Sequence, residues 1–210
     1  MMEKYDVKNV KIPSFLYQNI EEDVTKLHIE LELSIPVKPK IVAEKLGYDV
    51  HYLSEKTNKL EQRFLRRDEE GKIRDGYSFF NPKTHKFEIW VNDIDSSYYE
   101  HDDFTIAHEI GHIRSGHRSE SDLANKIANY YAAYLLVPSP LMYLFKCVKT
   151  EHIQKKFQVS IQCASLCEKR FYDWLEYGGP EKSYERRIKE YYKKIVQERN
   201  NSFEKGDNCL

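Results

Sequence analysis

The chain has 210 residues, and its 33 lysines and arginines against 34 aspartates and glutamates leave a formal net charge of -1. A surface without a strong basic field is not typical of proteins that bind nucleic acids or anionic membranes directly. The longest apolar run, residues 130–137, is far shorter than the ~20 residues that cross a bilayer, and the first residues contain no apolar signal core. We therefore expect a soluble, cytoplasmic protein without a membrane contact.

The first third of the chain predicts two helices. Apolar residues recur at steps of three and four over residues 14–32, which indicates an amphipathic helix with Ser14 as its cap. Pro36 ends this helix, Pro39 pre-sets the start of a short second helix, and Gly47 is suited to end it.

Three segments that alternate apolar and polar residues then predict strands, at residues 48–53, 76–81 and 86–92. A turn with a proline at residues 81–85 pairs the last two as a hairpin. In the last strand, Trp90 points to the face opposite its apolar neighbours. We expect a small three-stranded antiparallel sheet.

Helices dominate the chain after residue 100. An apolar period of about 3.6 begins at Asp102, behind an acidic start, and this helix ends near Gly116. Further helices are predicted over residues 119–137, 141–148, 151–157, 160–175 and 184–199. The fold class is therefore α+β, a small sheet packed against a mainly helical bundle.

A break at residues 178–180, Gly-Gly-Pro, divides the sequence. The main domain is expected over residues 1–176, and residues 177–210 are expected to hold a linker, a charged helix and a disordered polar tail. The four cysteines lack the spacing of a zinc ribbon, and Cys163 and Cys167 lie within a helical pattern, so we expect reduced thiols.

The motif that carries chemistry is His108-Glu109-Ile110-Gly111-His112, an H-E-x-x-H pattern inside the helix that begins at Asp102. The spacing places both imidazoles on one helix face, where they can converge on a single Zn²⁺. Glu109 is rotated by about 100° from His108, so it flanks the metal as a general base. The plainer alternative is a pair of core histidines on an amphipathic helix.

Two histidines do not complete a catalytic zinc site, so a third protein ligand must come from elsewhere. His117 follows His112 by five residues, whereas the metzincin pattern places its third histidine six residues on. The other common solution is an acidic residue from the next helix, which begins near Glu120 and Asp122.

Several motifs in this order make the chain resemble the ImmA/IrrE-type metallopeptidases, bacterial and phage proteins that cleave helix-turn-helix repressors. The resemblance covers residues 12–171. It is carried by residues 36–39, 43–48, 104–112, 128–138 and 157–160, and by Arg170. It implies a zinc peptidase whose partner is a helix-turn-helix transcriptional repressor.

One position departs from that family, in which the third ligand is usually a glutamate thirteen residues before the proline that ends the second helix. Counting back from Pro138 reaches Asn125, whose amide oxygen is a weak zinc donor compared with a carboxylate. Three outcomes are open: Asn125 ligates weakly, Asp122 or Glu120 substitutes, or metal binding is impaired. Asn129 matches the family pattern one turn later, where it would orient a ligating imidazole.

Two functions follow as hypotheses. The first is a zinc-dependent endopeptidase that cleaves a regulatory protein, with His108, His112 and Asn125 at the metal and Glu109 as the base. The second is a degenerate peptidase-fold protein that captures a repressor or another regulator without cutting it. Residues 151–157 and 160–171 could be taken for a helix-turn-helix, but the second helix lacks a basic stripe, so we expect no direct nucleic-acid binding.

Overall fold

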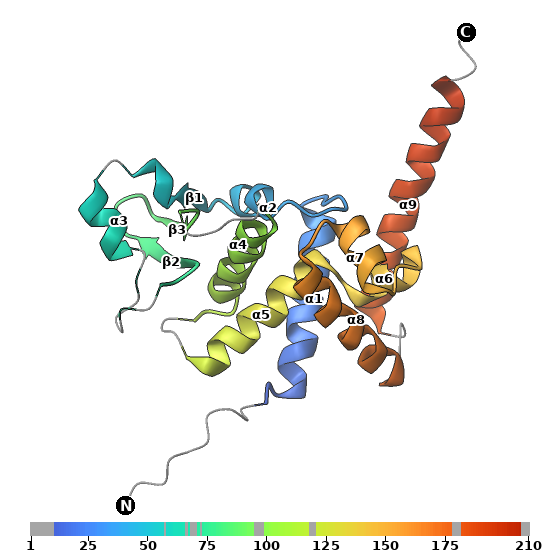
Figure 1. Cartoon of the computed structure of the whole chain (residues 1–210). Coiled ribbons are helices and arrows are strands. Elements are labelled where there is room, and N and C mark those ends of the chain that lie inside the picture. The colour runs from blue at the N-terminus through green and yellow to red at the C-terminus, as the bar shows by residue number, and fades with distance from the viewer. Residues whose placement is uncertain are drawn as a thin grey trace, which may run out of the picture.

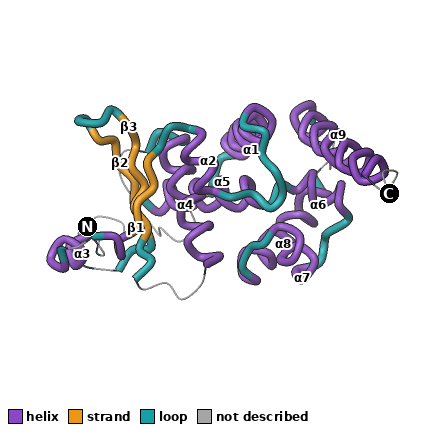
Figure 2. Tube along the Cα trace, turned by 90° about the horizontal axis from the view of Figure 1, so that it is seen from above, coloured by secondary structure: helices purple, strands orange, loops and turns teal. Residues whose placement is uncertain are grey.

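The computed structural model describes residues 11–56, 58–65, 67, 71, 73–94, 99–117, 121–177 and 182–206. Within these ranges the chain has an α+β fold, with the sheet at one end, helices α6 to α9 at the other, and α1, α4 and α5 between them (Figure 1, Figure 2). The helices are α1 (Ser14–Glu30), α2 (Pro39–Lys45), α3 (Lys59–Leu65), α4 (Tyr99–Arg114), α5 (Asp122–Leu136), α6 (Ser139–Phe145), α7 (Thr150–Phe157), α8 (Ile161–Glu176) and α9 (Ser183–Gly206). The strands are β1 (Asp49–Tyr52), β2 (Gly76–Asn81) and β3 (Lys86–Val91).

The elements predicted from periodicity are present, most of them with shifts of a few residues at their ends, but α9 continues to Gly206, into the segment expected to be a disordered tail. The start and end of α2 are confirmed, because Pro39 is in its first turn and Gly47 takes a left-handed φ of +78° just beyond it. The expected cap of α1 is wrong: Pro13 holds the cap position and Ser14 is the first helical residue. Helix α3 was not predicted.

The expectation of a purely antiparallel sheet is wrong, because the sheet is mixed. Strands β2 and β3 form the predicted antiparallel hairpin, but β1 pairs with β3 in parallel, and the strand order is β1-β3-β2. Strand β3 carries the most buried side chains, including Ile89 and Val91, so it occupies the centre with a neighbour on each side. The long segment between β1 and β2 lets the chain cross to the far edge, so that β3 returns in the direction of β1.

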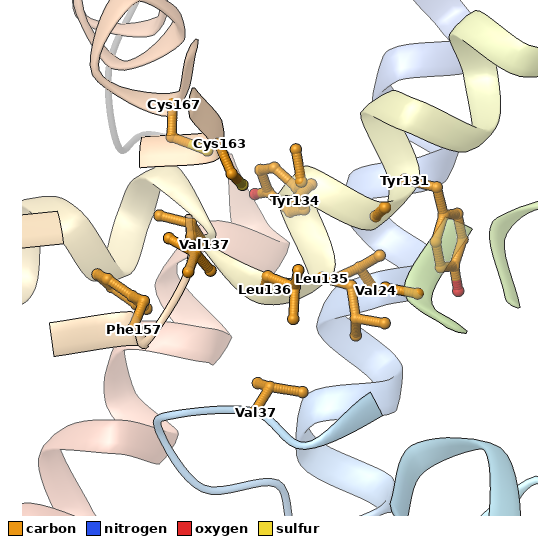
Figure 3. Packing of buried hydrophobic residues seen from close by; sticks show 14 of the residues in the cluster. Val24, Val37, Tyr131, Tyr134, Leu135, Leu136, Val137, Phe157, Cys163 and Cys167 are labelled. Atoms are coloured by element: carbon orange, nitrogen blue, oxygen red, sulfur yellow. The ribbon is translucent and has the colours of Figure 1, made fainter. Parts of the chain in front are cut away.

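Helix α5 runs through the middle of the core. Its side chains Tyr131, Tyr134, Leu135 and Leu136 are at most 4% exposed. Figure 3 shows them packed with buried side chains from other elements, such as Val24 of α1. A helix buried on most of its surface cannot move without disturbing several neighbours, so residues on its first turns are held firmly against α4.

Helix α9 belongs to the same packed core. It contacts α1 and α6, and the side chains of Ile188 and Tyr192 join the buried cluster. The charged sequence of this helix therefore has one buried face. The linker predicted at residues 178–180 and the end of the tail, residues 207–210, lie outside the described residues.

Two further expectations concern cysteines and membranes. Cys163 and Cys167 are buried free thiols and Cys147 is a partly exposed one, while Cys209 lies outside the described residues. Within the described ranges, no single helix is long and apolar enough to cross a bilayer. One pair of segments is long and apolar enough when the two are taken together, by length and composition alone: Asp122–Phe145 and Thr150–Phe157. The chain bends by 116° between them.

A buried histidine links α1 to α5 and α9. The Nε2 atom of His28 lies 3.0 Å from the carbonyl oxygen of Leu135, and its Nδ1 atom lies 2.8 Å from the hydroxyl of Tyr192. Burial lowers the pKa of His28 to about 4, against a smaller opposing effect of the Leu135 carbonyl. The folded protein therefore holds this imidazole neutral well below the pH at which an exposed one takes up a proton.

This pKa predicts acid sensitivity. Between pH 6.5 and about 4 the unfolded chain binds a proton at His28 that the folded chain does not, so stability falls as the pH falls through that window. For one such group, the free energy of unfolding should change by up to about 1.4 kcal/mol per pH unit within that window. In urea unfolding at several pH values, His28→Gln should show a shallower slope than the wild type. Since His112 titrates in the same window, the difference between the two proteins is the readout, and equal slopes would contradict the prediction.

Candidate metal site

Helices α4 and α5 approach closely at Gly111. A Cβ atom added there would lie 2.9 Å from Cβ of Tyr131 and 3.1 Å from both Cα and the carbonyl oxygen of Ala128. Gly111, which directly precedes the second histidine of the motif, therefore has no room for a side chain. This close contact lets side chains from the first turns of α5 reach the histidines on α4.

The close packing predicts that Gly111→Ala destabilises the protein. Alanine favours a helix over glycine by about 1 kcal/mol, but two of the atoms in its way are backbone atoms, and overpacking costs typically about 1–3 kcal/mol. We expect a net loss of about 1–2 kcal/mol in the free energy of unfolding, measured in urea. Ser165→Ala, on the exposed face of α8, is the control and should change stability by less than about 0.5 kcal/mol. A Gly111→Ala protein as stable as the wild type would mean that the helices can separate freely.

The two histidines of the motif face each other. Their Nε2 atoms lie 2.9 Å apart, and Nδ1 of His108 lies 2.9 Å from the amide oxygen of Asn129 on α5. Because that oxygen can only accept, Nδ1 of His108 carries the proton and its Nε2 atom presents a lone pair toward His112. The orienting role expected for Asn129 is thus matched by a direct contact.

His117 lies at the far side of His112. Its Nδ1 atom is 3.0 Å from Nδ1 of His112, so it faces the nitrogen opposite the one that meets His108. The three rings form a chain in which each neutral imidazole can donate one proton to the next. They do not converge on one point, and within the described part of the chain no three His, Cys, Asp or Glu side chains form a group able to hold a metal ion.

All three imidazoles are held toward their neutral forms. Burial is the main cause that lowers the pKa of His108 and His117, and for His108 the hydrogen bond with Asn129 opposes it. Burial, followed by the two neighbouring histidines, lowers the pKa of His112 to about 4. Neutral imidazole is the form that ligates zinc, so at neutral pH the pair needs no proton release before a metal binds.

The candidates for a third ligand are placed as follows. Asn125 lies one turn before Asn129 on α5 and beside His112, where it raises the pKa of that imidazole against the larger opposing effect of burial. Asp122 is an exposed residue of the first turn of α5, behind its cap Ser121. Glu120 lies outside the described residues. Of Asn125 and Asp122, the two candidates that the structure describes, Asn125 is the one that acts on His112.

Glu109 is buried and held by the sheet. Glu109 is only 6% exposed. The hydroxyl of Ser78 on β2 donates a hydrogen bond of 2.7 Å to its Oε2 atom. Gly76, two residues earlier on the same face of β2, allows the strand to approach, since a Cβ atom there would meet the side chain of Thr105 at 2.5 Å. Sequence reasoning missed Ser78. The alternation of Ser78 with the outward-facing Tyr77 indicates that Ser78 points to the inner face of the sheet. Only the order of the strands shows that this face of β2 lies against α4.

The donors present fit zinc in part. Two nitrogens on a tetrahedral zinc are about 3.3 Å apart when each Zn–N distance is about 2.0–2.1 Å, and the observed 2.9 Å between the Nε2 atoms is close to that separation. Asn125, whose side chain could offer a neutral oxygen, acts on His112. The site thus brings together two imidazole nitrogens and this amide, and the buried carboxylate of Glu109 lies on the same helix as the histidines.

Comparison with protein-family models, with curated proteins and with solved structures finds no match to this chain. The resemblance to the ImmA/IrrE-type metallopeptidases therefore rests on the sequence motifs alone and stays a prediction.

Proposed function

We propose that the chain is a cytoplasmic, zinc-dependent endopeptidase that acts on a regulatory protein, such as a helix-turn-helix repressor. The observation that carries the proposal is the pair of neutral imidazoles whose Nε2 atoms lie 2.9 Å apart, on the helix that also carries the buried carboxylate of Glu109. His108 and His112 would hold the metal, with Asn125 as the weak third ligand. The resemblance to the ImmA/IrrE-type family supplies the substrate class.

In this proposal the two histidines, Glu109 and Ser78 have separate roles in peptide hydrolysis. Zinc held by the histidines would polarise a peptide carbonyl and acidify water. Glu109 would take a proton from the attacking water and return it to the leaving amine. Ser78 donates to one oxygen of that carboxylate, so the base is fixed in orientation before a substrate arrives.

The position of β2 suits an extended substrate. In the order β1-β3-β2 this strand lies at an edge of the sheet, and Ser78 places it beside Glu109. An extended peptide can pair with such an edge through main-chain hydrogen bonds. A cleavable segment bound along β2 would run past the proposed base.

A second candidate function is capture of the regulator without cleavage. The observation that favours it is Asn125, because an amide replaces the carboxylate that would make the third ligand charged and strong. Both candidates use the same fold and the same partner class. They differ in whether zinc is bound at physiological concentrations.

Zinc binding by Asn125→Glu separates the two candidates. Because the new carboxylate would lie against His112, we expect zinc to bind about 10- to 100-fold more tightly than in the wild type. The measurement is a zinc titration against a chelating indicator, with elemental analysis of protein purified without added metal. Stoichiometric zinc in the wild type supports the peptidase, and zinc gained only by the variant supports capture.

The control is Gln162→Glu, which adds the same charge on the exposed face of α8 and should leave zinc affinity unchanged. A wild type and an Asn125→Glu variant that both fail to bind zinc would contradict His108 and His112 as zinc ligands.

A further inference from the structure

Helices α6, α8 and α9 lie at the end of the molecule opposite the sheet (Figure 2). Residues of these helices line a groove that is separate from the metal site. Its volume is about 580 Å³. Phe171 forms a buried part of its lining, while Tyr143, Tyr172 and Leu175 are between 40% and 52% exposed. Large apolar side chains gathered at an exposed groove are typical of a binding surface.

The charged residues that line the groove all have the same sign. They are Lys146 after α6, and Lys189 and Lys193 on α9, and the lining described by the structure contains no carboxylate. The ammonium group of Lys189 lies 5.7 Å from the ring centre of Tyr143, so its charge sits beside the exposed aromatic surface. Lys189 and Lys193 are one helical turn apart and form a row along one wall.

We propose that this groove docks an acidic amphipathic helix of a protein partner. Apolar side chains on one face of such a helix would enter between Tyr143, Tyr172 and Leu175. Carboxylates one turn apart on its flank would match the spacing of Lys189 and Lys193. The proposal does not depend on zinc, and it holds whether the chain cleaves its partner or only captures it.

The row of lysines favours a helix over a small anion. A helix presents carboxylates at four-residue intervals, so it can meet both ammonium groups of the row while its apolar face lies in the groove. A small ligand with a single anionic head would leave one of the two lysines of the row without an anionic partner. The apolar lining also comes from two helices, α6 and α8, which gives a long anchor several contacts.

The test uses a fluorescein-labelled synthetic helix with leucines at i, i+3 and i+7 and glutamates along one flank, titrated with the full chain and read by fluorescence anisotropy. We expect saturable binding that weakens with salt and falls by roughly tenfold or more in the double variant Lys189→Glu, Lys193→Glu. Tyr172→Ala should also weaken it. The matched control is Lys194→Glu on the same helix, at a residue outside the groove lining, which should leave the affinity within about twofold of the wild type.

Several outcomes would overturn the proposal. They are no binding of the acidic helix, equal binding by the double variant, or equal binding of a counterpart with lysines in place of the glutamates. Binding of 1-anilinonaphthalene-8-sulfonate that the double variant loses, without binding of the helix, would show a small-anion site instead. Because all the substitutions are at exposed or half-exposed side chains, an unchanged circular dichroism spectrum and melting temperature confirm that the variants are folded. Zinc content of the same samples reports on the proposed function separately.

Discussion

Glu109→Gln should abolish cleavage of a co-expressed helix-turn-helix repressor while leaving the zinc content unchanged. Glutamine keeps the size of the side chain, and its carbonyl oxygen can still accept the hydrogen bond from Ser78. It cannot take up a proton from water. A positioned general base contributes typically about 10²–10⁴-fold to a rate, so the loss should exceed the effect of any surface substitution. The measurement is the fraction of repressor cleaved over time, with zinc quantified in the same purified protein.

The matched control is Glu88→Gln, which replaces a second buried glutamate, on the outer face of the sheet. That side chain accepts from Trp90 and Asn81 and lies away from α4, so cleavage should continue. Cleavage by Glu109→Gln at the wild-type rate would refute the assigned base. If neither the wild type nor the variant cleaves but both retain the repressor on a column, the capture function is favoured.

Spacing alone predicted the parts of the site that lie on one helix. His108, Glu109 and His112 are brought together by the helical period, and that period is visible in the sequence. Asn125 and Asn129 lie on another helix, and they were expected at the histidines only from the family resemblance. The structure shows the contact of Asn129 with His108. Local spacing was sufficient for His108 and His112, because they are separated by one helical turn.

Contacts between distant segments were not predicted. The hydrogen bond from Ser78 to Glu109 depends on β2 lying at the edge next to α4, and no strand order was predicted from the sequence. Periodicity reports which face of a strand is buried, but it does not report which strand is its neighbour. The direction of β1 relative to β3 was missed for the same reason.

The buried face of α9 was missed because its partner is a charged residue. Glu21 of α1 is 5% exposed, and its carboxylate accepts hydrogen bonds of 2.6 Å from both Tyr130 and Tyr184. The Nζ atom of Lys182 lies 3.2 Å from Oε2 of the same carboxylate. In sequence, a glutamate on an amphipathic helix indicates the solvent face, so nothing marks Glu21 as the point where α1, α5 and α9 meet. Burial, reinforced by this carboxylate, raises the pKa of both tyrosines, so their hydroxyls keep their protons and donate.

Glu21→Ala should therefore destabilise the protein strongly and loosen α9. The change removes the acceptor of two tyrosine hydroxyls, and each buried donor left without a partner costs about 1–3 kcal/mol. We expect a loss of about 3 kcal/mol in the free energy of unfolding, together with faster amide hydrogen exchange in α9. Glu22→Ala, at the neighbouring and less buried residue, is the control and should change stability by less than about 0.5 kcal/mol. If the two variants unfold at the same urea concentration, Glu21 does not hold α9 to α1, and α9 would be stabilised by Ile188 and Tyr192 alone.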